Sequence, residues 1–99
     1  MKAIVDFCIV PIGVGVSVSK YVAACQLIFK KADLKTQMHA YGTNLEGEWD
    51  TVFEAIKACH EIVHEMGAPR ITATLKLGTR IDREQTMEEK VQSVLDKLE

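Results

Sequence analysis

The 99-residue sequence predicts an α+β fold in which two helices cover one face of a four-stranded antiparallel sheet. The main observation is the order of its segments: alternating or helical apolar spacing gives strand, helix, strand, strand, helix, strand and a further helix. The second is size, because 99 residues that are 47% hydrophobic suffice for one core. We therefore expect a single domain over residues 1–99.

The first strand is predicted over residues 2–12, where branched and aromatic side chains run up to Pro11 and Gly13. Alternation directs one set of side chains, Ala3, Val5, Phe7 and Ile9, to one face. Asp6 and Cys8 belong to the other set, so that face carries a charge.

An amphipathic helix is expected over residues 18–32, because apolar residues recur there at helical spacing. Ser17 or Ser19 is available as its N-cap. Cys25 lies in the apolar stripe, and we interpret it as a core thiol rather than a nucleophile. The three cysteines are far apart and form no C-x-x-C pair, which indicates reduced thiols and a cytoplasmic location.

Residues 36–49 predict two short strands that turn near Gly42. Alternation places polar and aromatic side chains on one face of this hairpin: Gln37, His39, Tyr41, Asn44, Glu46 and Glu48. A second helix follows from Asp50 to Met66, where Thr51 and Glu54 would form a capping box and Gly67 would end the helix.

This second helix contains the sequence HEIVH at residues 60–64, which matches the H-E-x-x-H motif of zinc peptidases. The residue that would complete the extended form of the motif is Arg70, which does not bind zinc. The helix also covers the closed side of the sheet, where no peptide cleft is expected. We interpret His60 and His64 as residues at the border of the buried face, although the i, i+4 pair leaves adventitious metal binding open.

The last strand is predicted over residues 71–80, with Ile71, Ala73, Leu75 and Leu77 inward and Thr72, Thr74 and Lys76 outward. Thr86 and Glu89 mark the capped start of a third helix. The complete order is that of a ferredoxin-like βαββαβ sandwich with an extra C-terminal helix.

Composition excludes several classes of protein. The net charge of -2, the pI near 5.9 and the lack of a basic stripe argue against nucleic acid as a partner. No stretch reaches the roughly 20 apolar residues that span a bilayer. Asp6 interrupts the apolar run at the amino end and no small-residue cleavage site follows, so we expect a strand there rather than a signal peptide.

The candidate binding site is the face of the sheet that no helix covers. In the ferredoxin-like order the first and third strands are central neighbours. The side chains expected to gather on this face are Asp6, Cys8, His39, Tyr41, Asn44, Glu46 and Lys76. Carboxylates beside an aromatic ring complement a small organic cation. A plain solvated face, or one that forms a dimer, is the alternative.

Four segments resemble the small thiamine-binding protein family, which is related to the tandem YkoF-like proteins: CIVPIG, SVSKYVA, YGTNLEGEWDTVFEAIKACHE and TLKLGTR. The likeness covers nearly the whole chain. Its most specific element is the hairpin motif G-T-x-(aliphatic)-E at residues 42–46. The family usually has methionine before that glycine, whereas this chain has Tyr41.

The resemblance implies a ferredoxin-like fold, dimers that associate into tetramers, and binding of thiamine or its pyrimidine moiety. It implies no established catalytic activity and no cofactor. The family positions that match are Thr43, Glu46, Lys76 and Arg80.

The site hypothesis gives each residue a role. Glu46 or Asp6 holds the aminopyrimidine or offsets the thiazolium charge, Tyr41 stacks on a ring and Thr43 orients it. Lys76 and Arg80 receive an anionic group if a phosphorylated form binds. The alternatives are a structural or regulatory oligomer without a ligand, and a small enzyme acting on a thiamine-like compound.

Overall fold

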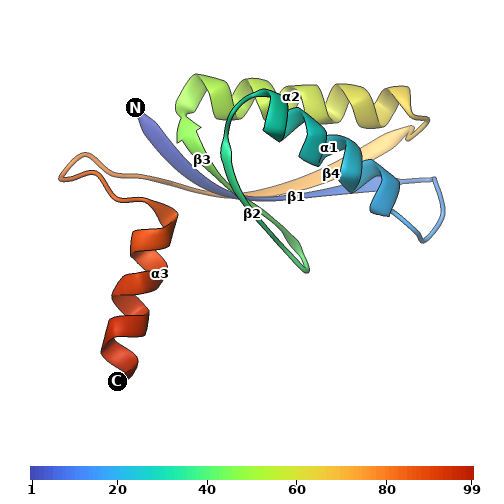
Figure 1. Ribbon diagram of the computed structural model, residues 1–99. Helices are drawn as coiled ribbons and strands as arrows, with labels where there is room; N and C mark the ends of the chain where they lie inside the picture. Colours follow the sequence, from blue (N-terminus) through green and yellow to red (C-terminus); the bar gives the residue numbers. More distant parts are fainter.

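The computed structural model describes all residues from 1 to 99 (Figure 1). Its elements are β1 (Lys2–Ile12), α1 (Ser19–Lys31), β2 (Lys35–His39), β3 (Gly42–Glu48), α2 (Trp49–Glu65), β4 (Arg70–Thr79) and α3 (Met87–Leu95), followed by a 3-10 turn at Asp96–Leu98. The predicted α+β class and element order are confirmed.

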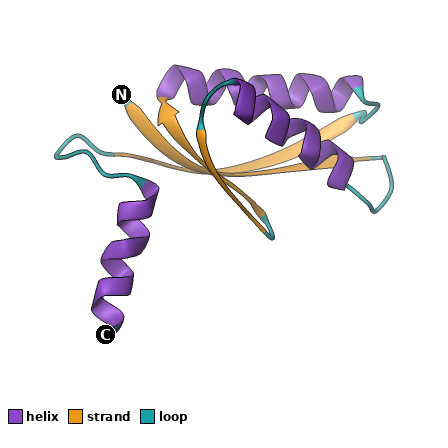
Figure 2. Ribbon diagram, viewed as in Figure 1, coloured by secondary structure: helices purple, strands orange, loops and turns teal.

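The four strands form one antiparallel sheet in the order β2-β3-β1-β4, so β1 and β3 are central neighbours as predicted. Helices α1 and α2 lie on one face of this sheet (Figure 2). The opposite face carries no helix across its centre, and we call it the open face. None of the helices combines the length and the hydropathy that a bilayer span requires.

The core lies between the sheet and helices α1 and α2. Alternation along β1 is regular: Ala3, Val5, Phe7 and Ile9 are buried beneath the helices, and the residues between them are not. Phe7 meets Phe29 of α1 edge to face, with ring centroids 6.2 Å apart. Such a pair contributes about 0.5–1.5 kcal/mol beyond its buried area.

The inward side of β4 is only partly covered. Leu75 and Leu77 lie opposite Phe7 and Val5 in the β1 register, so they face the helices as predicted. They nevertheless remain 36% and 42% exposed, because β4 is the edge strand and the helices cover only part of it.

Two predicted helix caps are wrong and one is confirmed. The N-cap of α1 is Val18, with no side-chain cap, so neither Ser17 nor Ser19 has that role. The Thr51–Glu54 capping box does not form, because α2 begins at Trp49, directly after β3.

The early start of α2 has a backbone cause. The Trp49 amide donates to the Met1 carbonyl at 2.9 Å, which places the first helical residue at the end of the sheet without an intervening loop. The cap of α3 is as predicted, since Thr86 Oγ1 accepts from the Glu89 amide at 3.1 Å.

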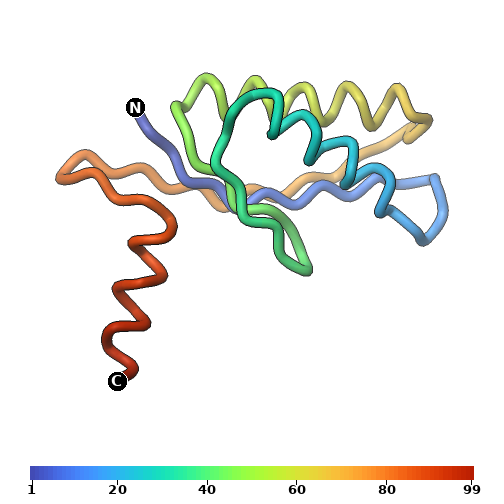
Figure 3. Tube along the Cα trace, in the orientation of Figure 1, coloured from blue at the N-terminus to red at the C-terminus, as the bar shows by residue number.

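Helix α3 extends away from the sheet on the side opposite α1 and α2 (Figures 1 and 3). Its first residue, Met87, is buried with 4% of its surface exposed. The apolar stripe of the helix is largely uncovered, and its exposed members are Val91, Val94, Leu95 and Leu98. The helix is therefore attached to the domain through its first turn.

The β2–β3 turn depends on Gly42. A Cβ atom there would lie 2.7 Å from the Phe7 carbonyl oxygen, a backbone atom that cannot move aside cheaply. We expect Gly42→Ala to lower the free energy of unfolding by about 1–3 kcal/mol, as overpacking typically does. Urea unfolding at constant m-value measures this change. Gly78→Ala is the matched control, because nothing lies within 4 Å of its added carbon. Equal losses in both variants would contradict this assignment.

Candidate functional site

The strand registers bring polar residues together across the open face. Gln37, Asn44, Asp6 and Lys76 form one row across all four strands. Asp6, Asn44 and Lys76 are thus neighbours, as alternation predicted. Cys8 lies one pair further along β1, opposite Thr74, and is half-buried.

His39 and Asp6 pair across the intervening strand β3. His39 Nε2 lies 2.9 Å from Asp6 Oδ1, and His39 Nδ1 accepts from the Tyr41 amide at 3.4 Å. In the neutral ring the proton is therefore assigned to Nε2. The imidazole can cross β3 because Gly42 has no side chain. A Cβ atom at that position would make a tight contact of 3.3 Å with His39 Cε1. The Asp6 carboxylate already has a partner within the protein.

Two predicted site residues lie away from this face. Thr43 is buried on the helix side, where its Oγ1 accepts from Gln26 Nε2 at 2.8 Å. This corrects the expectation that Thr43 orients a ligand beside Glu46, because the two side chains differ by an odd number of strand positions and point to opposite faces. Tyr41 lies at the tip of the hairpin and is 87% exposed.

A cavity of about 510 Å³ opens at the other end of the open face. It lies between the ends of β1, β3 and β4, the loop at residues 80–86 and the first turn of α3. Of the predicted site residues, only Glu46 and Arg80 line it. The predicted residues thus divide into a row around Asp6 and a separate cavity beside Glu46.

Glu46 combines burial with charge. Only 6% of it is exposed, and its Oε1 accepts from the Met87 amide at 2.7 Å. Its Oε2 lies 3.7 Å from Lys35 Nζ, and that ammonium also reaches Glu88 at 3.4 Å. A carboxylate at a helix N-terminus is favoured by the helix dipole and by the unpaired amides there. Glu46 therefore attaches α3 to the sheet and also forms part of the cavity wall.

Arg80 is engaged by its own loop. Its Nε and Nη2 donate to the two Asp82 carboxylate oxygens at 2.6 and 2.8 Å, and its Nη1 donates to Gln85 Oε1 at 2.8 Å. The hydrogen bond from Arg80 lowers the pKa of Asp82 to about 2. Arg80 thus holds the loop in shape, and its guanidinium is less available to an anion than we predicted.

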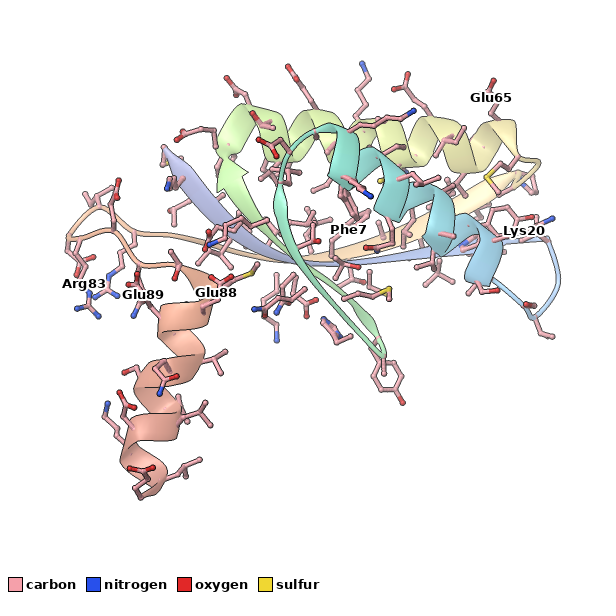
Figure 4. The ribbon with its side chains drawn as sticks, viewed as in Figure 1. Phe7, Lys20, Glu65, Arg83, Glu88 and Glu89 are labelled. Carbon is pink, nitrogen blue, oxygen red and sulfur yellow. The ribbon has the colours of Figure 1, made fainter.

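Three cationic residues of the cavity were missed by sequence reasoning. Lys2, Arg83 and Lys90 come from β1, from the loop after β4 and from α3. The charged segment RIDREQT at residues 80–86 was the available signal, but it has no periodicity that would orient its side chains. Figure 4 shows Arg83 extending from this loop below the sheet, on the side where α3 begins.

The H-E-x-x-H histidines lie far from this cavity, on α2. His64 Nδ1 donates to the Ala68 carbonyl at 2.8 Å, a bond that closes the C-terminal end of the helix. His60 is half-buried. No group of three His, Cys, Asp or Glu side chains is placed to hold a metal ion.

The thiols differ in accessibility. Cys25 and Cys59 are both buried, one on each helix. Cys59 donates a hydrogen bond to Cys25, and this bond, together with burial, raises the pKa of the Cys59 thiol. Cys25 is thus part of the core, as predicted.

We expect a disulfide reagent to modify only Cys8 rapidly in the native protein, because Cys25 and Cys59 are both buried and the raised pKa of Cys59 also suppresses its thiolate. Counting the thiols released before and after denaturation measures this. We expect one thiol to react rapidly in the native protein and three to react in denaturant. Cys8→Ser should abolish the rapid reaction. Rapid modification of all three native thiols would contradict the buried pair.

The attachment of α3 can be tested at Glu46. Glu46→Ala removes a charged hydrogen-bond acceptor worth about 1.5–3 kcal/mol, so the Met87 amide and the first turn of α3 should exchange hydrogen about tenfold faster or more. Glu46→Gln keeps an oxygen for Met87 and should show a smaller change. Unaltered exchange in Glu46→Ala would show that the helix is held by other contacts.

Comparisons with known proteins agree with this fold. The family model described as "Thiamine-binding protein" matches residues 5–95. The UPF0045 protein sll0230 of Synechocystis is 66% identical over 94 residues, which are 95% of this chain and 78% of that protein. The crystal structure of MJ1052 from Methanocaldococcus jannaschii superimposes with a TM-score of 0.89 at 39% identity, covering 96% of this chain and 97% of the other.

A fourth match concerns the fold alone. A protein described as a putative thiamine biosynthesis/salvage protein (TM0486), from Thermotoga maritima, has a TM-score of 0.80 at 19% identity, covering 95% of this chain and 99% of the other. The family match and the identity to sll0230 extend over nearly the whole chain. The chain belongs to the thiamine-binding protein (UPF0045) family.

Proposed function

We propose that this chain is a cytoplasmic, non-catalytic binding protein for thiamine or a thiamine-related pyrimidine, acting as a buffer or carrier within a homo-oligomer. The observation that carries the proposal is Glu46, a buried carboxylate in the wall of a cavity of about 510 Å³. The family description supports the choice of ligand.

The chemistry of Glu46 suits this ligand. Thiamine carries a cationic thiazolium ring and an aminopyrimidine, and a carboxylate can offset the first or accept hydrogen bonds from the second. The Met87 amide fixes Glu46 Oε1, while Oε2 has only Lys35, at 3.7 Å. The second oxygen can therefore accept from a ligand. The cavity volume falls within the roughly 300–1,000 Å³ of small-molecule sites.

The cavity lining supports binding rather than covalent catalysis. It contains no cysteine, serine or histidine that would form a nucleophile–base pair. The Asp6–His39 pair lies outside the lining, and both of its side chains are about two-fifths exposed. We propose recognition and release of an unchanged ligand.

A structural oligomer is the second candidate function, and a separate observation favours it. The stripe of α3 and the partly covered side of β4 leave apolar side chains exposed in the monomer: Leu75, Leu77, Val91, Val94, Leu95 and Leu98. Apolar surface of this kind commonly marks a protein interface. A stable oligomer that binds no organic ligand would favour this function over the first.

Isothermal titration with thiamine and with its hydroxymethylpyrimidine fragment tests the proposal. We expect saturable binding that weakens about 10- to 100-fold in Glu46→Ala, the loss typical of a charged hydrogen-bond partner. Glu46→Gln loses the charge but keeps an oxygen for the Met87 amide, so it distinguishes the loss of charge from the loss of the α3 attachment. His60→Ala is the control and should change affinity less than twofold. Equal losses in the Glu46 and His60 variants would refute the site, and no heat with either ligand would refute the function.

A further inference from the structure

We propose that the cavity beside Glu46 has a second, cationic half that receives a phosphoryl group, so that phosphorylated thiamine is preferred over thiamine. The inference rests on the proposed function and names the ligand class within it. It is carried by three unpaired cations, Lys2, Arg83 and Lys90, which come from three separate elements and line one cavity.

These three side chains have no partner inside the protein. None of them takes part in any side-chain hydrogen bond or ion pair of the fold. All three are exposed, so their head groups can move towards a ligand. Because the chain as a whole has a net charge of -2, three free cations around one cavity are a local feature.

The carboxylates around the cavity do not cancel this charge. Glu46 is held by the Met87 amide and Lys35, and Glu48 is held by the Met1 ammonium at 3.0 Å. Glu84 is the only carboxylate of the lining that has no partner. Glu88, outside the lining, pairs with Lys35. The lining therefore has three cations and one carboxylate without a hydrogen bond or ion pair, and Asp82, on which the charge of Arg83 also acts, is bonded to Arg80.

The loop that carries Arg83 is shaped in advance. Arg80 holds Asp82 through two hydrogen bonds and Gln85 through a third, so the backbone on both sides of Arg83 is fixed by the same guanidinium. Lys90 is similarly placed by the capped first turn of α3, where its amide donates to the Thr86 carbonyl at 3.1 Å. An anion would therefore meet cations whose backbone positions are already set.

A phosphoryl group fits this arrangement better than a carboxylate. It carries a charge of about -1.5 to -2 at neutral pH and offers three acceptor oxygens. Arginine can bind two of these oxygens at once, and a lysine supplies a point charge to the remainder. With Glu46 also in its wall, the cavity offers a carboxylate to the cationic ring of a zwitterion and free cations to its phosphoryl group.

Titration of the full chain with thiamine, thiamine monophosphate, thiamine diphosphate and inorganic diphosphate tests this inference. At low ionic strength we expect the phosphorylated forms to bind at least tenfold more tightly than thiamine. Added salt should reduce that advantage, because exposed charges are screened. The double variant Arg83→Gln, Lys90→Gln should abolish this advantage without weakening thiamine itself, because the two lost charges repel a cationic ring.

Matched variants keep the test specific. Lys57→Gln removes an exposed lysine of α2, away from the cavity, and should leave the phosphate advantage intact. Arg83→Lys keeps the charge but loses the two-oxygen geometry of arginine, so it should retain part of the phosphate advantage. Thermal unfolding of the double variant shows whether the fold is intact.

The outcomes separate this inference from the proposed function. Equal affinity for thiamine and its phosphates, or an undiminished advantage in the double variant, would overturn the inference and leave thiamine binding standing. Binding of inorganic diphosphate that depends on Arg83 and Lys90, without binding of thiamine, would support the cationic half and overturn the proposed function. No binding of any compound would overturn both.

Discussion

The hydrogen bond from the Met87 amide to Glu46 Oε1, 2.7 Å long, joins the two parts of this structure. On one side of it is a sheet whose core is complete beneath α1 and α2. On the other is a helix whose apolar stripe is exposed and which contacts the domain through its first turn. The cavity between them exists because this bond holds α3 at the end of β3. One buried carboxylate thus serves both architecture and recognition.

The open face and the face covered by α1 and α2 carry different polar groups. On the closed side, the zinc-like motif of α2 provides a helix-ending hydrogen bond from His64 to Ala68. On the open side, Gly42 lets His39 reach Asp6, so the carboxylate that was predicted as an alternative to Glu46 is already bonded to an imidazole. Burial distinguishes the two acids, because Asp6 is 42% exposed whereas Glu46 is 6% exposed.

Periodicity predicted the parts of the fold that depend on a buried face. The alternation of β1 identified its core residues, and the strand order followed from the sequence of elements. The predicted cap of α2 is wrong because a tertiary contact, the Trp49–Met1 hydrogen bond, fixes where that helix begins in place of local side-chain preference. The cap of α3 succeeded because that helix has few tertiary contacts to override local preference.

The site was predicted less completely than the fold. Glu46 came from the hairpin motif and lies in the cavity, whereas Thr43 of the same motif faces the core. Lys2, Arg83 and Lys90 could not be grouped from sequence, because a loop and a helix that projects from the domain bring them together. These three side chains come together only because of the direction that the chain takes after residue 80. The loop there has no hydrophobic periodicity from which that direction could be predicted.

The most direct test of the central claim is a map of backbone amide chemical shifts during titration with thiamine. Binding beside Glu46 predicts the largest changes at Ile4, Glu46 and Gly78 around the cavity and at Met87, whose amide is bonded to that carboxylate. Changes confined to His39 and Tyr41 at the tip of the β2–β3 hairpin would contradict it, because the ligand would then be held by the Asp6 row.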